Sequence, residues 1–425
     1  MIERRRSIFS RLPLLAIYAG GCLLVLVSIF YAGSWIYAYL KETGNGAVQE
    51  DIERIERSKL TRSDLPSLLG ELRPMPSPLT GDYVFSGEDE GFVATTSYDT
   101  SLQNYIVNLL GRSRTHQAAV VVIRPDNGQI LAMADHTKGD DKGTVSLCLK
   151  ADIPAASLFK IIAAAAAIEG RSFTLDRTMY FRGGKYTLYR SQLKQDKGRY
   201  VTKASFREAF AGSINPVFGK IGIYDLGRVL MTEYADRFLF NHEIPFDLQL
   251  AKSSIHVPDD DFGLAEIASG FNKKTLISPL HAALITSTVA NRGKMMAPWL
   301  VRDVKDESGR ILYSAIPSGL SNPIRENTAE KLRILMMDTV AKGTCRKAFQ
   351  PLKRKKAFRN IDLGAKTGTI NDQLDQYKYD WLTAYALPQE GDRGICIAVL
   401  AIHGEMLGIR AKDLARHIIN YHFIS

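Results

Sequence analysis

The sequence predicts an α+β domain with one antiparallel sheet, whose strands come from both ends of the domain, and a helical subdomain between them. Two early apolar runs, 118–123 and 129–134, flank the turn-forming stretch Arg124-Pro125-Asp126-Asn127-Gly128 and are typical of a hairpin. Three late segments have strand-like patterns, and they cover 363–369, 381–387 and 395–402. Because helical patterns fill the middle, the early and late strands should meet in one sheet.

Helices are expected between and beside these strands. Residues 161–168 are apolar on every side, which indicates a buried helix. A second apolar helix is expected at 279–291, and a third at 327–341 should begin with a capping box formed by Asn327 and Glu330. Shorter helical patterns lie at 102–110 and 412–421.

Composition places the chain among globular proteins with a basic surface. Its 425 residues are 45% apolar, enough for a large core, and the formal net charge is +10. Basic clusters lie at 4–6 and 353–356 without any nucleic-acid-binding motif, so anionic lipid or polymer is the expected partner and nucleic acid is not.

The four cysteines, at 22, 148, 345 and 396, lack Cys-x-x-Cys spacing, so neither a zinc site nor a redox pair is indicated. They are expected to be small buried side chains, with a bridge between Cys148 and Cys345 left open.

An uncharged apolar stretch near the N-terminus predicts a membrane anchor. Residues 12–40 carry no charge, follow four arginines, and exceed the roughly 20 residues needed to span a bilayer. A cleaved signal peptide is the alternative, but its apolar core is usually about 7 to 15 residues long. The arginines predict a cytoplasmic tail at 1–11 and an external location for the rest. A juxtamembrane spacer or small pedestal is expected at 41–95, and the main domain at 96–425.

The chemistry is carried by Ser157-Leu158-Phe159-Lys160 at the start of the buried helix. Residues three apart on a helix share a face, so the serine hydroxyl and the lysine amine can touch. A serine is a poor nucleophile until a base takes its proton, and a lysine in a dry, cationic environment can be that base. Alone, this spacing is common and proves little.

Two further motifs follow in order, Ser213-Ile214-Asn215 and then Lys366-Thr367-Gly368-Thr369 inside a predicted strand. The three together resemble the motif set of penicillin-binding proteins and class A β-lactamases. Further similar segments extend the resemblance to the penicillin-binding-protein transpeptidase domain over about residues 95–425, and these are Ser97 to Gln103, Arg124 to Met133, Gly343-Thr344 and Asp380-Trp381. The expected fold is therefore β-lactamase/transpeptidase-like.

The resemblance implies a role for each residue of the motifs. Ser157 would attack the carbonyl of a D-Ala-D-Ala stem peptide and pass its proton to Lys160. Ser213, held between Lys160 and Lys366, would protonate the leaving amine. The other roles implied are substrate-amide binding by Asn215, carboxylate binding by Lys366, Thr367 and Thr369, an oxyanion hole from the backbone N–H groups of Ser157 and Thr369, and close backbone approach at Gly368.

The reaction expected from this resemblance is cross-linking of peptidoglycan stem peptides through a Ser157 acyl-enzyme, with β-lactams as covalent inhibitors and no metal or organic cofactor. The protein would sit in the bacterial cytoplasmic membrane with its catalytic domain on the periplasmic or extracellular side, with cell-wall assembly proteins as further partners. Asp380 is expected to be a solvated strand end, and His403 to have a surface or packing role.

Other readings of the same motifs stay open. A D,D-carboxypeptidase would pass the acyl group to water. A β-lactamase would need a base for that water, and Glu233 and Glu243 lie in the right region without the usual motif around them. A β-lactam sensor or a non-catalytic scaffold is less favoured, because the tail is short and the motifs are whole. The segment 41–95 is shorter than the usual pedestal, and Ala268-Ser269-Gly270-Phe271-Asn272 replaces the family's Gly-Gln-Gly stretch.

Overall fold

The computed structural model describes residues 60–424, except 71, 87–90, 140–144, 196–199 and 392. The described residues belong to one compact unit that starts at Leu60. The predicted tail at 1–11, the predicted anchor at 12–40 and the first part of the predicted spacer lie outside the described residues. Within the described ranges, no helix is both long and apolar enough to cross a bilayer.

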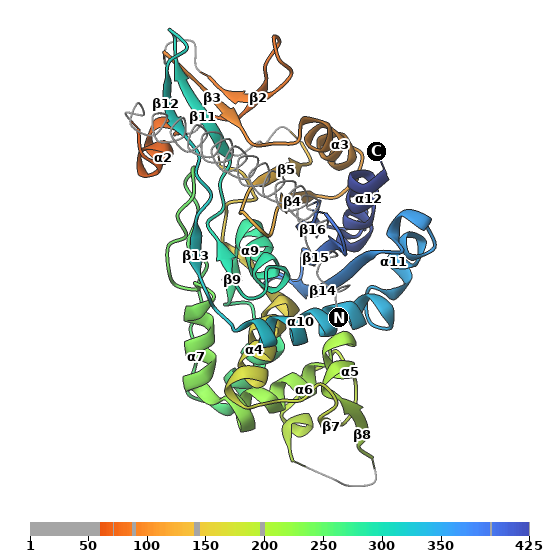
Figure 1. The fold of residues 1–425 in the computed structure, drawn as a ribbon. Coiled ribbons are helices and arrows are strands. Elements are labelled where there is room, and N and C mark those ends of the chain that lie inside the picture. Colours follow the sequence, from red (N-terminus) through yellow and green to blue (C-terminus); the bar gives the residue numbers. More distant parts are fainter. Residues whose placement is uncertain are drawn as a thin grey trace, which may run out of the picture. The chain divides into compact units, whose positions relative to one another are not determined.

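The main sheet has five antiparallel strands in the order β14-β15-β16-β4-β5 (Figure 1). Its strands are β14 (Ile361–Asn371), β15 (Lys378–Pro388), β16 (Ile395–His403), β4 (Gln117–Ile123) and β5 (Ile130–Thr137). Strand β16 pairs with β4, so the C-terminal strands join the early hairpin directly. This confirms the prediction that strands from both ends of the domain form one sheet.

Helices cover both faces of the sheet. Side chains alternate between the two faces along each strand, so each strand contributes to an apolar cluster on either side. In β4, Val121 and Ile123 face one apolar cluster, whereas Val120 and Val122 face the other. The first cluster contains α4 (Lys160–Gly170) and α9 (Pro279–Ala290); the second contains α3 (Thr100–Gly111), α11 (Arg346–Lys353) and α12 (Ala411–Ile424). The fold is therefore three layers, with the sheet in the middle.

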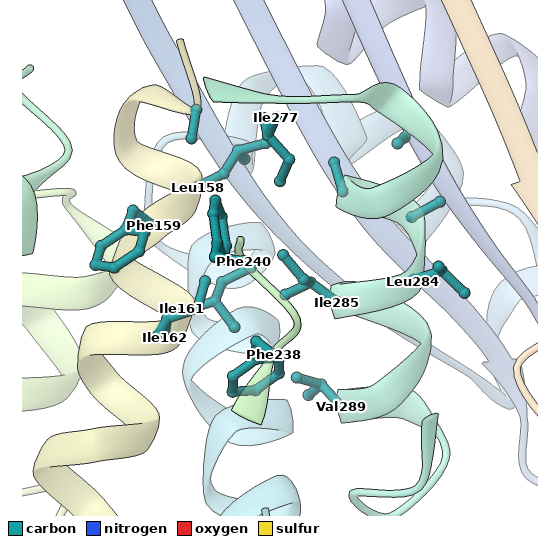
Figure 2. Close-up of a cluster of buried hydrophobic side chains, with 14 of the residues drawn as sticks. Leu158, Phe159, Ile161, Ile162, Phe238, Phe240, Ile277, Leu284, Ile285 and Val289 are labelled. Atoms are coloured by element: carbon teal, nitrogen blue, oxygen red, sulfur yellow. The ribbon is translucent and has the colours of Figure 1, made fainter. Parts of the chain in front are cut away.

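The cluster on the α4 side holds the active-site helix in place. Figure 2 shows side chains of α4 and α9 meeting around Phe238 and Phe240, which come from the loop after α7 (Gly227–Arg237). The Phe159 and Phe240 rings pack edge to face with centroids 5.7 Å apart. A continuous apolar environment around α4 explains why residues 161–168 are apolar on every side.

The remaining elements complete a helical subdomain and short ribbons. They are η1 (Arg62–Asp64), α2 (Leu65–Leu69), β6 (Ile153–Pro154), η2 (Ala156–Phe159), β7 (Thr178–Phe181), η3 (Arg190–Leu193), β8 (Thr202–Ser205), α5 (Phe206–Ala211), α6 (Asn215–Lys220), the π-helical turn η4 (Ile221–Leu226), α7 (Gly227–Arg237), α8 (Asp261–Ser269), β9 (Leu276–Ile277), β10 (Met295–Met296), β13 (Gly319–Ser321), α10 (Glu326–Ala341) and η5 (Lys356–Phe358).

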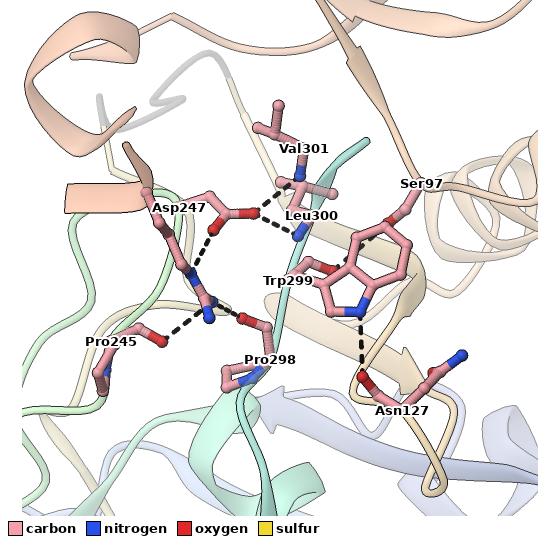
Figure 3. Close-up of polar contacts among 9 residues, drawn as sticks. Ser97, Asn127, Pro245, Asp247, Pro298, Trp299, Leu300 and Val301 are labelled. Carbon is pink, nitrogen blue, oxygen red and sulfur yellow. Dashed lines mark hydrogen bonds and ion pairs between the residues drawn. The ribbon is translucent and has the colours of Figure 1, made fainter. Parts of the chain in front are cut away.

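A second five-stranded sheet has the order β1-β2-β3-β11-β12. Its strands are β1 (Met75–Pro76), β2 (Tyr83–Phe85), β3 (Phe92–Thr96), β11 (Val301–Asp306) and β12 (Ile311–Ser314). Buried Asp247 ties this sheet to the helical region: it accepts hydrogen bonds from the backbone N–H groups of Leu300 (2.6 Å) and Val301 (2.8 Å) and from Arg62 (2.9 Å; Figure 3). Strand β3, which lies mostly in the predicted spacer, thus pairs with β11 from inside the predicted catalytic domain.

The start of α10 differs from the prediction. The helix begins at Glu326 with Arg325 as the N-cap residue, which makes no side-chain cap, so the capping box of Asn327 and Glu330 is wrong. The carboxylate of Glu169 on α4 takes its place, because it accepts hydrogen bonds from the Arg325 N–H (2.9 Å) and the Thr328 hydroxyl (2.8 Å). A cap supplied by a distant residue leaves no local sequence signal.

Cys148, Cys345 and Cys396 are free thiols, each with no exposed surface. This confirms the prediction of small buried side chains for these three. Burial raises the pKa of the Cys345 thiol to about 12, so it is an inert thiol at neutral pH.

Candidate active site

Ser157 lies in the 3-10 turn η2, and Lys160 is the first residue of α4. The Lys160 amine is 2.8 Å from the Ser157 hydroxyl. Ala156, just before the serine, has a φ of +49°, which is uncommon for a residue other than glycine. Gly270 packs against this turn so closely that a Cβ added to it would lie 2.0 Å from the Ala156 carbonyl oxygen. The turn that presents Ser157 is therefore braced by the loop after α8.

Lys160 has two further partners besides Ser157. Its amine lies 2.7 Å from the Asn215 side-chain oxygen and 2.5 Å from the Ser269 carbonyl oxygen. Both oxygens can only accept hydrogen bonds, so they take two N–H groups of the amine. When the amine is neutral, its lone pair is left to face the Ser157 hydroxyl, which is the arrangement a general base requires.

The electrostatics favour that neutral amine. Lys160 has no exposed surface, and burial, followed by the nearby charge of Lys366, lowers its pKa well below the ordinary value. Lys366 is buried to the same extent, and burial lowers its pKa to about 7. Burial therefore lowers the pKa of both amines of the site below that of an exposed lysine.

Ser213 lies in the short connection between α5 and α6, and Asn215 is the first residue of α6. The Lys366 amine donates to the Ser213 hydroxyl (3.0 Å) and to the Thr367 carbonyl (2.7 Å). Ser213 has a φ of +54°, a second uncommon conformation at a motif residue. The structure therefore pairs Ser213 with Lys366, whereas Lys160 makes its hydrogen bonds to Ser157, Asn215 and the Ser269 carbonyl.

Strand β14 is an edge of the main sheet and lines the site with Lys366, Thr367, Gly368 and Thr369. A Cβ added to Gly368 would lie 3.3 Å from the Ser157 backbone nitrogen, so glycine allows the strand to run close to the nucleophile's turn. The Thr367 and Thr344 hydroxyls lie 2.7 Å apart. Thr369 is exposed and follows Gly368 on the same strand. The structure thus brings the eight predicted site residues of the three motifs together.

Asp380 is not a solvated strand end, and that prediction is wrong. It is only 4% exposed, and it accepts hydrogen bonds from Arg410 at 2.6 and 3.0 Å and from the Ala411 N–H at 3.0 Å. Although burial opposes ionisation, the His403 ring, 3.7 Å away, and the hydrogen bonds from Arg410 hold the pKa of Asp380 well below its usual range. The Thr369 hydroxyl also faces it at 3.4 Å. His403 is fully buried, which confirms the packing role.

Sequence reasoning missed several contributors to the site. The Ser269 carbonyl belongs to the backbone and carries no motif signal, although the departure at 268–272 did mark that loop. Thr344 was noted only as part of a similar segment.

The two glutamates considered as the base of a β-lactamase make no contact with Ser157. Glu233 pairs with Arg237 at 2.5 Å on α7, and Glu243 is exposed.

The fold and the site define a class of protein, a serine acyltransferase with a lysine beside its nucleophile. A family model described as penicillin binding protein transpeptidase domain matches residues 118–419. The chain belongs to this family.

Proteins that are similar in sequence to this chain agree with its membership of the family. The chain is 24% identical over 387 residues to peptidoglycan D,D-transpeptidase PbpA of Mycobacterium tuberculosis, a match covering 83% of this chain and 75% of that protein. It is 24% identical over 300 residues to Stage V sporulation protein D of Bacillus subtilis, covering 68% of this chain. The chain spans 45% of the length of the sporulation protein.

Solved structures share the fold. The D,D-transpeptidase domain of a peptidoglycan glycosyltransferase from Eggerthella lenta superposes with a TM-score of 0.66 at 23% identity, covering 83% of this chain and 89% of that one. The imipenem acyl-enzyme complex of penicillin-binding protein A from M. tuberculosis superposes with a TM-score of 0.63 at 22% identity, covering 76% and 78%.

Proposed function

We propose that this protein is a peptidoglycan D,D-transpeptidase that cross-links stem peptides through an acyl-enzyme on Ser157. The observation that carries the proposal is the arrangement around Lys160, whose amine is held by Asn215 and the Ser269 carbonyl and lies 2.8 Å from the serine hydroxyl. Family membership and the names of the relatives support the same reaction.

In the first step, the Ser157 oxygen attacks the carbonyl between the two D-Ala residues, and Lys160 takes its proton. The backbone N–H groups of Ser157 and Thr369 stabilise the oxyanion; losing one such donor typically costs about 10² to 10³ in rate. Ser213, bonded to Lys366, supplies the proton to the departing D-Ala amine. The C–N bond breaks, and the donor is left as an ester on Ser157.

Recognition of the donor falls to the other motif residues. Protonated Lys366, with Thr367 and Thr369, binds the terminal carboxylate, and this anion favours the charged form of the lysine. Asn215 binds the substrate amide. In the second step, an amine of another stem peptide attacks the ester, which releases Ser157 and forms the cross-link. A β-lactam enters at the same point and leaves a slowly released acyl group on Ser157; the imipenem complex of the mycobacterial relative supports this.

The acceptor is tested by giving the full-length protein a D-Ala-D-Ala donor peptide together with a D-amino acid and analysing products by mass spectrometry. The proposal predicts release of D-Ala and transfer of the donor acyl group to the added amine, both absent in Ser157→Ala. Hydrolysis alone, at every acceptor concentration, would instead make the protein a D,D-carboxypeptidase.

We also propose that residues 12–40 anchor the protein in the cytoplasmic membrane, with 1–11 inside and the catalytic domain outside. Their uncharged length and the arginines before them support this topology. A protease added outside intact spheroplasts should digest the catalytic domain of the full-length protein. A catalytic domain protected until the cells are lysed would contradict the topology.

A further inference from the structure

A loop beside the active site, residues 183–193, is rigidly held and is called here the Tyr186 loop. The side chain of Gln192, which is 5% exposed, donates to the carbonyls of Arg182 (2.8 Å) and Gly184 (3.2 Å) and accepts from the Tyr189 N–H (2.9 Å). Leu188 and Leu193 anchor the loop by packing with Ala265 of α8 in a small apolar cluster. The loop therefore keeps a fixed shape.

This loop is bonded directly to a motif residue of the site. The Asn215 N–H donates to the Lys185 carbonyl (2.7 Å), and the Asn215 side-chain amide donates to the Tyr186 carbonyl (2.9 Å). The oxygen of the same amide contacts Lys160, which contacts Ser157. A short chain of hydrogen bonds through Asn215 and Lys160 therefore connects the Tyr186 carbonyl to the Ser157 hydroxyl. Two or three extended residues of a bound peptide, at about 3.3 Å each, would span this distance.

The loop exposes side chains that a folded protein usually buries. Tyr186 is 63% exposed and Tyr189 is 61% exposed, and two exposed cations flank them, with Lys185 before Tyr186 and Arg190 after Tyr189. A hollow of about 420 Å³ lies against Tyr189 and Gln192. Large aromatic side chains on a rigid loop lose little conformational entropy on binding, which suits a recognition surface.

We propose that the Tyr186 loop binds the stem peptide of the acyl donor, at the residues that precede its D-Ala-D-Ala end. The inference rests on the proposed function for the identity of the polymer. The aromatic faces of Tyr186 and Tyr189 pack on the peptide, and Lys185 and Arg190 attract carboxylates along it. The loop thus selects long, acidic donors over short ones.

The test measures binding, so that it does not depend on turnover. Full-length protein carrying Ser157→Ala is titrated by calorimetry with a stem pentapeptide ending in D-Ala-D-Ala, and with acetyl-D-Ala-D-Ala as the short probe. Adding Tyr186→Ala and Tyr189→Ala should weaken pentapeptide binding about tenfold, equivalent to about 1.4 kcal/mol, and leave the short probe unchanged. Tyr186→Phe with Tyr189→Phe should restore pentapeptide binding.

Tyr200→Ala is the matched control, because Tyr200 is 81% exposed and lies outside the loop. Equal weakening of both probes would show that the substitutions act through Asn215, and would overturn the inference, as would unchanged pentapeptide binding. Failure of the proposed function is distinguishable. In that case, the unmodified protein forms no acyl-enzyme with the pentapeptide, whatever the loop variants do to binding.

Discussion

The Lys366 amine lies 3.0 Å from the Ser213 hydroxyl, while the amine of Lys160 lies 2.8 Å from that of Ser157. Each motif serine is thus paired with its own buried lysine. The charge on Lys366 adds to the effect of burial on Lys160, and both lower the pKa of that amine. The two lysines therefore influence each other's protonation as well as holding the two serines.

Replacing Lys366 with methionine should move the pH dependence of acylation. Because the Lys366 charge helps to lower the pKa of Lys160, its removal raises that pKa towards the ordinary value. Acylation by a β-lactam rises as Lys160 loses its proton, so its rising limb should shift to higher pH in Lys366→Met. Stopped-flow acylation rates between pH 5 and 10 measure the shift. A rising limb at the same pH in both proteins would show that Lys366 does not lower the pKa of Lys160.

Gly270→Ala should disable the site. A Cβ at this position meets the Ala156 carbonyl at 2.0 Å and displaces the turn that holds Ser157, and misplacement of reacting groups by about 1 Å can cost 10²-fold in rate. Gly309→Ala is the matched control. Both glycines have a positive φ, +65° at Gly270 and +80° at Gly309, but nothing lies within 4 Å of a Cβ added at Gly309. Equal penicillin-acylation rates in the two variants would contradict the bracing role of Gly270.

Thr344→Val should weaken substrate capture without changing the fold. Valine has a similar shape, but it removes the hydroxyl 2.7 Å from Thr367 and frees the Thr367 hydroxyl to rotate. We expect kcat/KM for acylation by carboxylate-bearing donors to fall about fivefold, the usual effect of one hydrogen bond. Thr344→Ser keeps the hydroxyl and should retain most of the activity. Loss of activity in both variants would point to packing instead.

Asp380→Asn should destabilise the protein by about 3 kcal/mol at pH 7, because it leaves the Arg410 guanidinium without its charge partner. The folded pKa of Asp380 is lowered, so its stabilising contribution is present above the unfolded pKa of about 3.9 and is lost as pH falls through and below that value. Urea unfolding of both proteins should therefore show a difference that shrinks in acid. A difference independent of pH would contradict a charged Asp380.

The sequence predicts the fold and the three motifs because these depend on local patterns. Strand-like patterns mark β14, β15 and β16, and residue identity marks Ser157, Ser213 and Lys366. Contributions from distant residues leave no such trace. Buried Asp380 is paired with Arg410, 30 residues away in the sequence, and α10 is capped by Glu169 of α4. The Ser269 carbonyl, as a backbone group, can be placed at Lys160 only by the three-dimensional structure.

The central claim is that Ser157 is the nucleophile and Lys160 its base. The most direct measurement incubates the full-length protein with a fluorescent penicillin and locates the covalent adduct by peptide mass spectrometry. The account predicts one long-lived adduct on Ser157, and a loss of about 10² to 10⁴ in its rate of formation in Lys160→Ala with folding unchanged. An adduct on another residue, or undiminished labelling of Lys160→Ala, would contradict it.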